Sequence, residues 1–185
     1  PAAGDSLVQI FPTGPDQENV ILSPIYFAAL ALARSSIRIS TPYFVPDPGL
    51  ILALQHAAYR GIRVDILIPS KTDNPIVLWA GRSYYQELVR AGVNIHEFEH
   101  GMLHSKVVSV DDQWTLISSA NMDQRSFLFN FEVTASVFDE RISRKLHEEF
   151  ESDLLRSSRV KPVAGTGPIG PALLEGAARL LSPLL

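Results

Sequence analysis

Four polar residues in the second half of the chain have the types and spacing of a site that handles phosphate. His104 and Lys106 stand two apart on an expected strand, so their side chains point to the same face. Ser119 and Asn121, also two apart, follow the next expected strand, and a tight hairpin would place them beside the first pair. An imidazole able to attack phosphorus, an ammonium that offsets negative charge and an amide that donates hydrogen bonds favour a phosphate site.

The same residue types do not favour a metal site. An ammonium beside an imidazole repels a divalent cation, and no pair of carboxylates flanks these two residues. Glu132 opens a later expected strand, where its carboxylate could accept a hydrogen bond from the second ring nitrogen of His104. That bond would fix which ring nitrogen carries the proton and would stabilise the charged form of the imidazole. A reactive histidine needs a partner in this orienting role.

Hydrophobic periodicity and turn residues predict the elements that position this site. Up to residue 98 strands alternate with helices, which favours an α/β fold with a mixed, mainly parallel sheet and helices on both faces. Three strand candidates then follow, and Asp111-Asp112-Gln113 is expected to turn the chain between the first two. The expected strands are 6–11, 37–41, 62–68, 93–98, 106–110, 114–118 and 131–138, and the expected helices are 19–34, one opened by Asp47-Pro48 and stopped at Gly61, 75–91 and 140–157.

Composition and charge limit the classes of function. The 185 residues, 46% hydrophobic and 19% charged, suit one domain with a folded core. A net charge of −4 supplies no global field for gathering nucleic acid, and the absence of cysteine excludes disulfides, thiol nucleophiles and thiolate metal sites. The longest uncharged apolar stretch, 20–33, is shorter than the run of about 20 residues that spans a bilayer and contains Pro24, so no membrane span is expected.

The chain is expected to divide into a lobe and a short tail. Residues 1–160 would form the catalytic lobe, followed within 161–185 by a Pro/Gly-rich linker over 161–171 and a C-terminal amphipathic helix. The apolar stripe of that helix could lie on a bilayer, dock on its own domain or join a partner lobe, of which packing is the commonest use. The start, Pro1-Ala2-Ala3, lacks an initiator methionine, which suggests a processed product or a piece of a longer chain. The stripe consists of Leu173, Leu174, Ala177, Leu180, Leu181 and Leu184.

A single histidine on a strand is usually a packed or surface residue, so His-x-Lys alone carries little weight. The joint pattern is more specific: His104-x-Lys106-x-x-x-x-Asp111, then Ser119-Ala120-Asn121, then Asn130-Phe131-Glu132. At these residues the chain resembles the phospholipase D (PLD) superfamily, whose signature is His-x-Lys-x-x-x-x-Asp, a Gly-Ser-x-Asn segment and a downstream Glu. Segments 41–47, 82–85, 91–93, 121–126 and 178–185 look like the C-terminal half of bacterial cardiolipin synthases, so the resemblance covers nearly the whole chain.

The resemblance implies a PLD-like α/β/α sandwich and a phosphatidyltransferase. The implied reaction joins two phosphatidylglycerols into cardiolipin and glycerol through a phosphohistidine, with no metal or organic cofactor. His104 would be either the nucleophile or the acid/base. Lys106 and Asn121 would hold the nonbridging oxygens, with Ser119 assisting. Asp111 belongs to the signature, yet its place after a strand suggests a structural role.

Further residues are weaker candidates. Tyr43 and Phe44 lie near expected element ends, where they could contact substrate, although core packing is the commoner role. His100 is close enough in sequence to the motif to rim the pocket. Arg125 could serve the site or pair with a carboxylate. Ser118 stands where the family usually has glycine, which is harmless if its φ is negative.

The chain carries one His-Lys signature, whereas two-lobed members of the family carry two. It therefore represents half an active site, and a second lobe is expected, either the N-terminal half of a parent chain or a homodimer mate. The resemblance further implies phosphatidylglycerol, cardiolipin and a membrane surface as partners, no nucleic acid, and a location at the bacterial cytoplasmic membrane as the peripheral portion of a tethered enzyme. Two alternatives stay open: a phosphodiesterase or nuclease completed by homodimerisation, which the acidic balance disfavours, and an isolated lobe that binds lipid without turnover.

Overall fold

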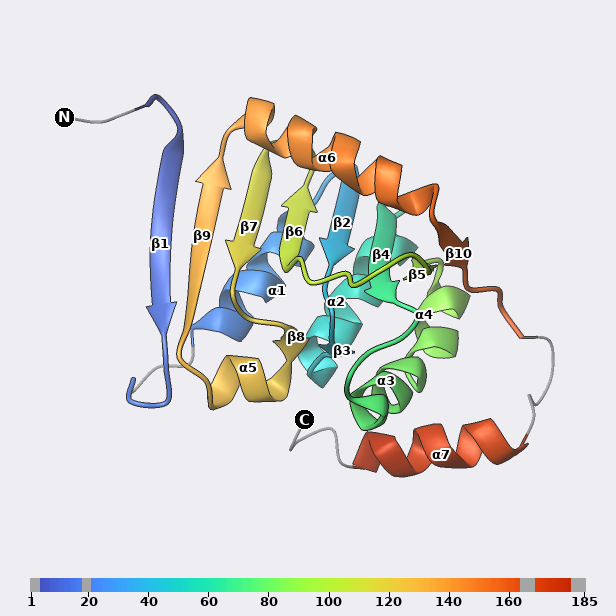
Figure 1. Ribbon diagram of the computed structural model, residues 1–185. Helices are drawn as coiled ribbons and strands as arrows, with labels where there is room; N and C mark the ends of the chain where they lie inside the picture. Colours follow the sequence, from blue (N-terminus) through green and yellow to red (C-terminus); the bar gives the residue numbers. More distant parts are fainter. Residues whose placement is uncertain (1–3, 18–20, 164–168, 181–185) are drawn as a thin grey trace.

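The computed structural model describes residues 4–17, 21–163 and 169–180. These residues form an eight-stranded mixed sheet with helices on both faces, which confirms the expected α/β sandwich (Figure 1). A second, two-stranded sheet, β3 with β8, lies at the end of the main sheet where β2 stops. The order in the main sheet is β1-β9-β7-β6-β2-β4-β5-β10.

The strands and helices follow the chain in alternation up to β5. The strands are β1 (Leu7–Thr13), β2 (Ser36–Ser40), β3 (Phe44–Val45), β4 (Arg63–Pro69), β5 (Asn94–Phe98), β6 (Val107–Val110), β7 (Trp114–Ser118), β8 (Met122–Asp123), β9 (Glu132–Phe138) and β10 (Ser157–Arg159). The helices are α1 (Leu22–Leu32), α2 (Pro48–Tyr59), α3 (Pro75–Arg82), α4 (Tyr85–Ala91), α5 (Gln124–Leu128), α6 (Glu140–Leu154) and α7 (Ile169–Leu180). None of the described helices is both long enough and apolar enough to cross a bilayer.

The expectation of a mainly parallel sheet is wrong. Within the main sheet β2 pairs in parallel with β4, and β4 with β5, but β1–β9, β9–β7, β7–β6, β6–β2 and β5–β10 are antiparallel. A parallel neighbour requires a crossover of about a dozen residues, usually a helix. Residues 99–106 contain no helix, so the chain re-enters the sheet at the same end and β6 runs against β2.

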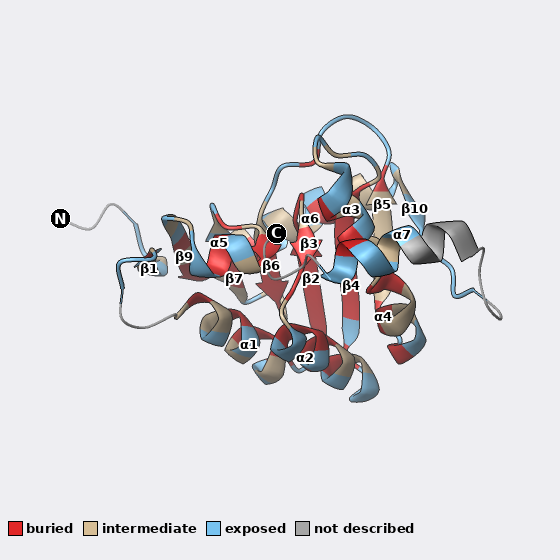
Figure 2. Cartoon of the chain, turned by 90° about the horizontal axis from the view of Figure 1, so that it is seen from below, coloured by how far each residue is buried: buried red, intermediate tan, exposed pale blue. Residues whose placement is uncertain are grey.

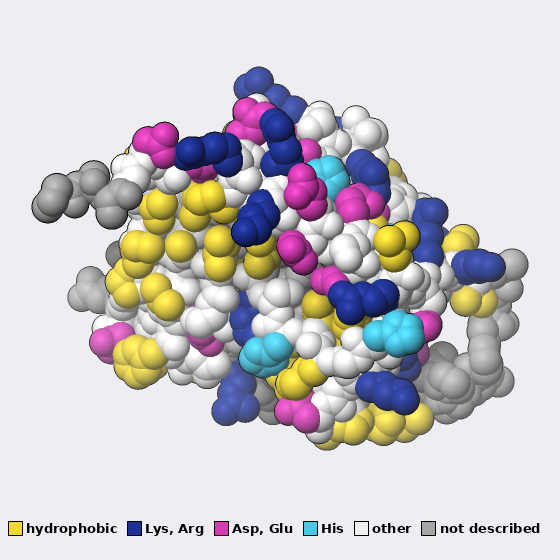
Figure 3. Space-filling model, turned by 45° about the horizontal axis from the view of Figure 1, so that its top comes forward, with side chains coloured by type: hydrophobic (Ala, Val, Ile, Leu, Met, Phe, Trp, Pro, Cys, Tyr) yellow, Lys and Arg dark blue, Asp and Glu magenta, His cyan; other side chains and the backbone are white. Residues whose placement is uncertain are grey.

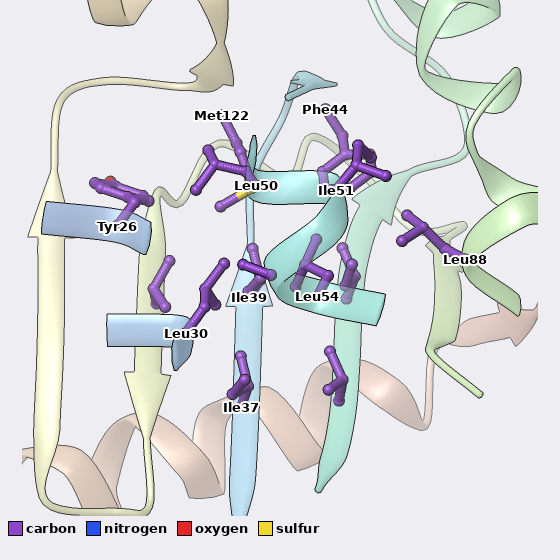
Figure 4. Packing of buried hydrophobic residues seen from close by; sticks show 14 of the residues in the cluster. Tyr26, Leu30, Ile37, Ile39, Phe44, Leu50, Ile51, Leu54, Leu88 and Met122 are labelled. Carbon is purple, nitrogen blue, oxygen red and sulfur yellow. The ribbon is translucent and has the colours of Figure 1, made fainter. Parts of the chain in front are cut away.

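The core lies between the sheet and the pair α1 and α2. Ile37 and Ile39 on β2 and Ile66 on β4 are fully buried against Leu30 of α1 and Leu54 of α2 (Figure 4). Viewed from below, toward the ends of the strands, the central strands are buried, while α1 and α2 expose their outer faces (Figure 2). The opposite face of the sheet is covered by α6, where the Thr115 hydroxyl lies 2.8 Å from that of Ser143.

The helix expected over 75–91 is broken into α3 and α4. At the break the Ser83 hydroxyl donates to the Ala80 carbonyl at 2.6 Å, and the Tyr84 N–H donates to the Gly81 carbonyl at 3.1 Å. A Cβ on Gly81 would lie 2.7 Å from the Phe44 carbonyl oxygen, so glycine lets α3 approach β3 closely. The two halves pack on different partners, α3 on β3 and α4 on α2, and a straight helix could not reach both.

The C-terminal helix differs from expectation in its start and in its buried side. α7 begins at Ile169, inside the stretch expected to be a linker, and packs against α3 (Figure 1). Ala178 is buried, whereas Leu174 and Leu180 of the expected stripe are exposed. The Arg179 guanidinium lies over the Tyr84 ring at 4.3 Å and holds α7 on its own domain. Some positions with sequence-based expectations lie outside the residues that the structure describes. They are 1–3, 19–20, 164–168, Leu181, Leu184 and the side chain of Leu173.

Asp111 ties the β6–β7 hairpin to the start of β2, at the end of β6 away from Lys106. Its carboxylate accepts the backbone N–H groups of Arg34, Ser35 and Ser36 at 2.8–2.9 Å, and its own N–H donates to the Ser36 carbonyl at 2.9 Å. Asp111 and Asp112 both have φ of 55°, the left-handed conformation of a tight hairpin turn. Burial acts to raise the pKa of Asp111, but the backbone N–H groups outweigh it and hold that pKa below its ordinary value.

We expect Asp111→Asn to lower the free energy of unfolding by about 1–2 kcal/mol at neutral pH, because a charged acceptor for several N–H groups is lost. The folded-state pKa lies below 3.8, so the stabilisation is present above that value and disappears as pH falls through the folded-state pKa. Denaturant unfolding at neutral pH and well below pH 3.8 measures both effects. Glu148→Gln, on the exposed side of α6, is the matched control. An equal loss at both pH values would contradict this assignment.

Candidate active site

The candidate site lies at the end of the sheet where β2, β4 and β7 stop and where β6 and β9 begin (Figure 1). His104 and Lys106 were expected on a strand, but β6 starts at Val107, so both lie in the loop before it. Ser119 and Asn121 lie between β7 and β8, and Glu132 is the first residue of β9.

Backbone pairing draws these segments together. The Ser118 N–H donates to the Lys106 carbonyl at 3.0 Å, which continues the β6–β7 ladder by one step. The Ser119 N–H donates to the Val133 carbonyl at 3.0 Å and joins the same turn to β9. The predicted hairpin is therefore confirmed, and its register sets the motif residues on neighbouring strand ends.

His104 and Lys106 form a close pair at the surface. The Lys106 ammonium nitrogen lies 3.3 Å from His104 Nδ1 and donates to the His104 carbonyl at 3.0 Å. His104 is exposed and Lys106 partly buried. Burial lowers the pKa of Lys106, while the carboxylates of Glu132 and Asp123 act to raise it. A cation beside an accessible imidazole is an arrangement that can hold a phosphate against a nucleophile or a proton donor.

Glu132 does not hold His104 within this chain, contrary to expectation. Its carboxylate accepts hydrogen bonds from the Ser119 hydroxyl and from the Asn130 amide, the latter at 3.2 Å. The Ser119 hydroxyl also accepts the Val133 N–H at 3.0 Å. These bonds satisfy Glu132 inside the turn that carries Ser119, which is why it is directed there and not toward His104.

Asn121 brings an unsatisfied polar atom to the site. Its backbone N–H donates to the Ser126 hydroxyl at 3.2 Å, but its amide oxygen is buried with no hydrogen-bond partner among the described residues. Buried polar atoms without partners are rare, and a bound ligand commonly supplies the missing group. Beside it, burial raises the pKa of Asp123, whose carboxylate accepts the Ser126 N–H and caps α5.

Ser118, which replaces the usual glycine of the signature, is accommodated without strain. Asp111 and Asp112 are the described non-glycine residues with positive φ, so Ser118 is not in the left-handed region. Its hydroxyl accepts the Ala120 N–H at 3.0 Å and lies 2.7 Å from the Thr134 hydroxyl. The serine thus supports the turn that presents Ser119.

The weaker candidates lie in different places. Phe44, expected to contact substrate, is 2% exposed in the core, because β3 pairs with β8 and directs it inward. Tyr43 is partly buried, and its hydroxyl donates to Asp73. His100 is exposed in the loop after β5. Arg125 lies on α5 with an exposed side chain that has no ion-pair partner in the described part of the chain.

A cavity of about 210 Å³ opens beside His104, and the sequence did not indicate it. Its polar residues, Lys71, Thr72 and Asp73, follow β4 and were not predicted as site residues. Asp73 and Tyr43 are 30 residues apart, and no short motif joins them. A clue was available, since loops at the carboxyl ends of parallel strands commonly bind ligands. The described residues include no group of three His, Asp or Glu side chains that could hold a metal ion.

Comparisons with known proteins agree with the geometry. The family model described as "Cardiolipin synthase, PLD-like domain" matches residues 26–154. Cardiolipin synthase 2 of Bacillus anthracis is 47% identical over 179 residues, which are 96% of this chain and 35% of that protein. The chain therefore spans about a third of the length of this relative.

Two solved structures share the fold. The PLD family member Nuc from Salmonella typhimurium superposes with a TM-score of 0.73 at 18% identity, over 85% of this chain and 99% of that one. The phosphatidylserine synthase of Haemophilus influenzae gives a TM-score of 0.75 at 15% identity, over 97% of this chain and 48% of that one. At such identities the likeness establishes the fold alone.

We expect Lys106→Met to weaken the binding of inorganic phosphate about tenfold, because a charge-assisted hydrogen bond is lost at a partly solvated position. Titration calorimetry or NMR shifts at low salt would measure the affinity. Lys145→Met, which removes an exposed charge from α6, is the control and should change it little. Equal affinities of wild type and Lys106→Met would show that this ammonium does not bind the anion.

Proposed function

The chain belongs to the family of cardiolipin synthase PLD-like domains, and from this membership we propose that it is one lobe of a phosphatidyltransferase. The proposed enzyme joins two phosphatidylglycerols into cardiolipin and glycerol. The observation that carries the proposal is the Lys106 ammonium 3.3 Å from the exposed His104 ring, beside a turn that presents Ser119 and Asn121.

The proposed reaction uses two histidines in turn. One attacks phosphorus as the bond to glycerol breaks, while the other gives a proton to the departing glycerol oxygen. The second histidine then takes the proton from a hydroxyl of another phosphatidylglycerol, whose oxygen attacks phosphorus and breaks the phosphorus–nitrogen bond. His104 takes one of these two roles, and a second lobe supplies the other histidine.

The other polar residues have supporting roles in this proposal. Lys106 neutralises the nonbridging oxygens, on which charge is concentrated in the transition state. The NH2 group of Asn121 donates a hydrogen bond to a nonbridging oxygen, and Ser119, tied to Glu132, assists. Asp111 takes no part in the chemistry, because all its carboxylate contacts are at the far end of β6.

An uncovered apolar face supports the proposal of a second PLD-like lobe. On the side of the sheet that α6 covers, Val8, Ile10, Ile117 and Val133 of β1, β7 and β9 are exposed by 46%, 56%, 38% and 49%. Figure 3 shows hydrophobic side chains gathered over this edge of the sheet, next to charged side chains. Apolar patches of this kind mark interaction sites, and this one borders the turn that carries Ser119.

We further propose that the lobe works at the surface of the bacterial cytoplasmic membrane, as the peripheral portion of a tethered enzyme, because both proposed lipids reside in a bilayer. No observation on the described residues favours nucleic acid, and the net charge of −4 disfavours it.

His104→Gln in the full-length protein should lower the turnover of phosphatidylglycerol vesicles by about a thousandfold or more, since either role of His104 is essential. Cardiolipin and released glycerol, quantified together, should form in equal amounts in the wild type. His56→Gln, an exposed histidine on α2, is the control. Cleavage of DNA without lipid turnover would replace this proposal with the nuclease alternative.

Ile10→Lys should separate the lobe from its proposed partner and reduce lipid turnover several-fold, because a charge would be buried at the apolar face. Sedimentation distinguishes a homodimer, which dissociates, from a two-lobed chain, which stays monomeric and loses thermal stability. Leu155→Lys, at a side chain 89% exposed elsewhere, is the control. If Ile10→Lys behaves like Leu155→Lys in all three measurements, this face does not contact the second lobe.

A further inference from the structure

The cavity beside His104 is built from three loops that follow the parallel strands β2, β4 and β5. Residues 42–43, 69, 71–73 and 101–104 line it, and His104 is the last lining residue of the third loop. The carboxyl ends of parallel strands in open α/β sheets are the usual place for a ligand. A molecule in this cavity of about 210 Å³ would therefore lie next to the histidine that the proposed reaction uses.

One wall of the cavity holds a fixed carboxylate. The hydroxyls of Tyr43 and Thr72 both donate to Oδ1 of Asp73, the latter at 3.0 Å. The other carboxylate oxygen, Oδ2, accepts neither of these two hydrogen bonds. The hydrogen bond from Tyr43 contributes most to holding the pKa of Asp73 below its ordinary value, and Asp73 is therefore charged at neutral pH. Asp73 is exposed to solvent and outside the signature residues.

This chemistry selects one part of a phospholipid. Asp73 and Lys71 bring opposite charges to the cavity, so it favours neither a phosphate nor an ammonium, and an acyl chain against Asp73 would strip the charge of water at high cost. A hydroxyl group, by contrast, donates a hydrogen bond to a carboxylate. An ammonium headgroup could pair with Asp73 but would meet the like charge of Lys71 in the same cavity.

We propose that this cavity is the subsite for the glycerol headgroup, and that Asp73 selects glycerol by accepting a hydrogen bond from the hydroxyl next to the reacting oxygen. The proposal rests on the proposed function, in which the alcohol that leaves and the alcohol that enters are both glycerol hydroxyls beside His104. The apolar rings of Pro42 and Pro69 line the same cavity and pack on the carbon skeleton. Tyr43 is a positioning residue that orients the Asp73 carboxylate.

The test compares two lipids that differ in the headgroup alone. The full-length protein, in excess over lipid, is mixed with phosphatidylglycerol or with phosphatidylethanol, and the single-turnover rates of glycerol release and ethanol release are compared as a ratio. This step forms the phosphohistidine and needs no acceptor hydroxyl, which phosphatidylethanol lacks. Asp73→Asn should lower this ratio about tenfold while leaving turnover of phosphatidylethanol within about twofold, because ethanol lacks the second hydroxyl. Tyr43→Phe should lower the ratio by about two- to threefold, since the carboxylate remains but loses its orientation.

Each outcome decides a separate point. Glu148→Gln, an exposed carboxylate on α6, should keep the wild-type ratio. An unchanged ratio in Asp73→Asn, with wild-type turnover intact, would overturn the glycerol subsite and leave the proposed function standing. A wild-type preference for phosphatidylethanolamine that Asp73→Asn abolishes would overturn it too, since the carboxylate would then recognise an ammonium. If the wild type turns over no phospholipid, both the proposed function and this subsite fail.

Discussion

The structure of the site depends on one backbone hydrogen bond, from the Ser118 N–H to the Lys106 carbonyl. It extends the β6–β7 ladder past the last regular pair, Val107 with Ile117, and thereby sets the turn of Ser119 beside the loop of His104. Side chains alternate along a strand, so a slip of one residue between β6 and β7 would move His104 and Lys106 away from the turn of Ser119. The same strand is fixed at its other end by Asp111, whose carboxylate is held by three consecutive backbone N–H groups. The signature thus places two residues that we propose for chemistry at one end of β6 and one residue for register at the other end.

The local chemistry of the turn explains why glycine is dispensable at position 118. A glycine would be required if φ were positive or if a Cβ met the backbone, and Ser118 does not have a positive φ. The Ser118 hydroxyl instead accepts a hydrogen bond from the Ala120 N–H and forms another with the Thr134 hydroxyl. Behind it the buried Tyr26 has its pKa raised to about 12 by burial, so its hydroxyl stays neutral and can hydrogen-bond the same serine. The turn therefore rests on a neutral polar layer beneath the charged site.

Much of the fold was predictable because regular elements leave periodic patterns. The strand 114–118 and the hairpin at Asp111 were expected as they occur, and the cap of α2 by Asp47 was expected from the Asp-Pro pair. The two-residue strands β3 and β8 were missed because so short a run has no period. The break between α3 and α4 was missed because apolar positions continue through it, whereas the two halves pack on β3 and α2, which are distant in sequence. Contacts between distant segments, such as Tyr43 with Asp73 and Glu132 with Ser119, carry no signal in either segment alone.

Three features of the described chain support the proposal that a second surface completes this one. The amide oxygen of Asn121 is buried without a partner, which is costly unless another molecule supplies a donor. His104 is exposed and donates no hydrogen bond to a carboxylate among the described residues, although such a bond commonly fixes the tautomer of a reactive histidine. The apolar face of Val8, Ile10, Ile117 and Val133 next to the site is open to water. A substrate alone could satisfy the first feature but neither of the others, whereas a second lobe placed on the open face could bring a carboxylate to His104. The observations are thus better explained by a shared active site than by a lobe that acts alone.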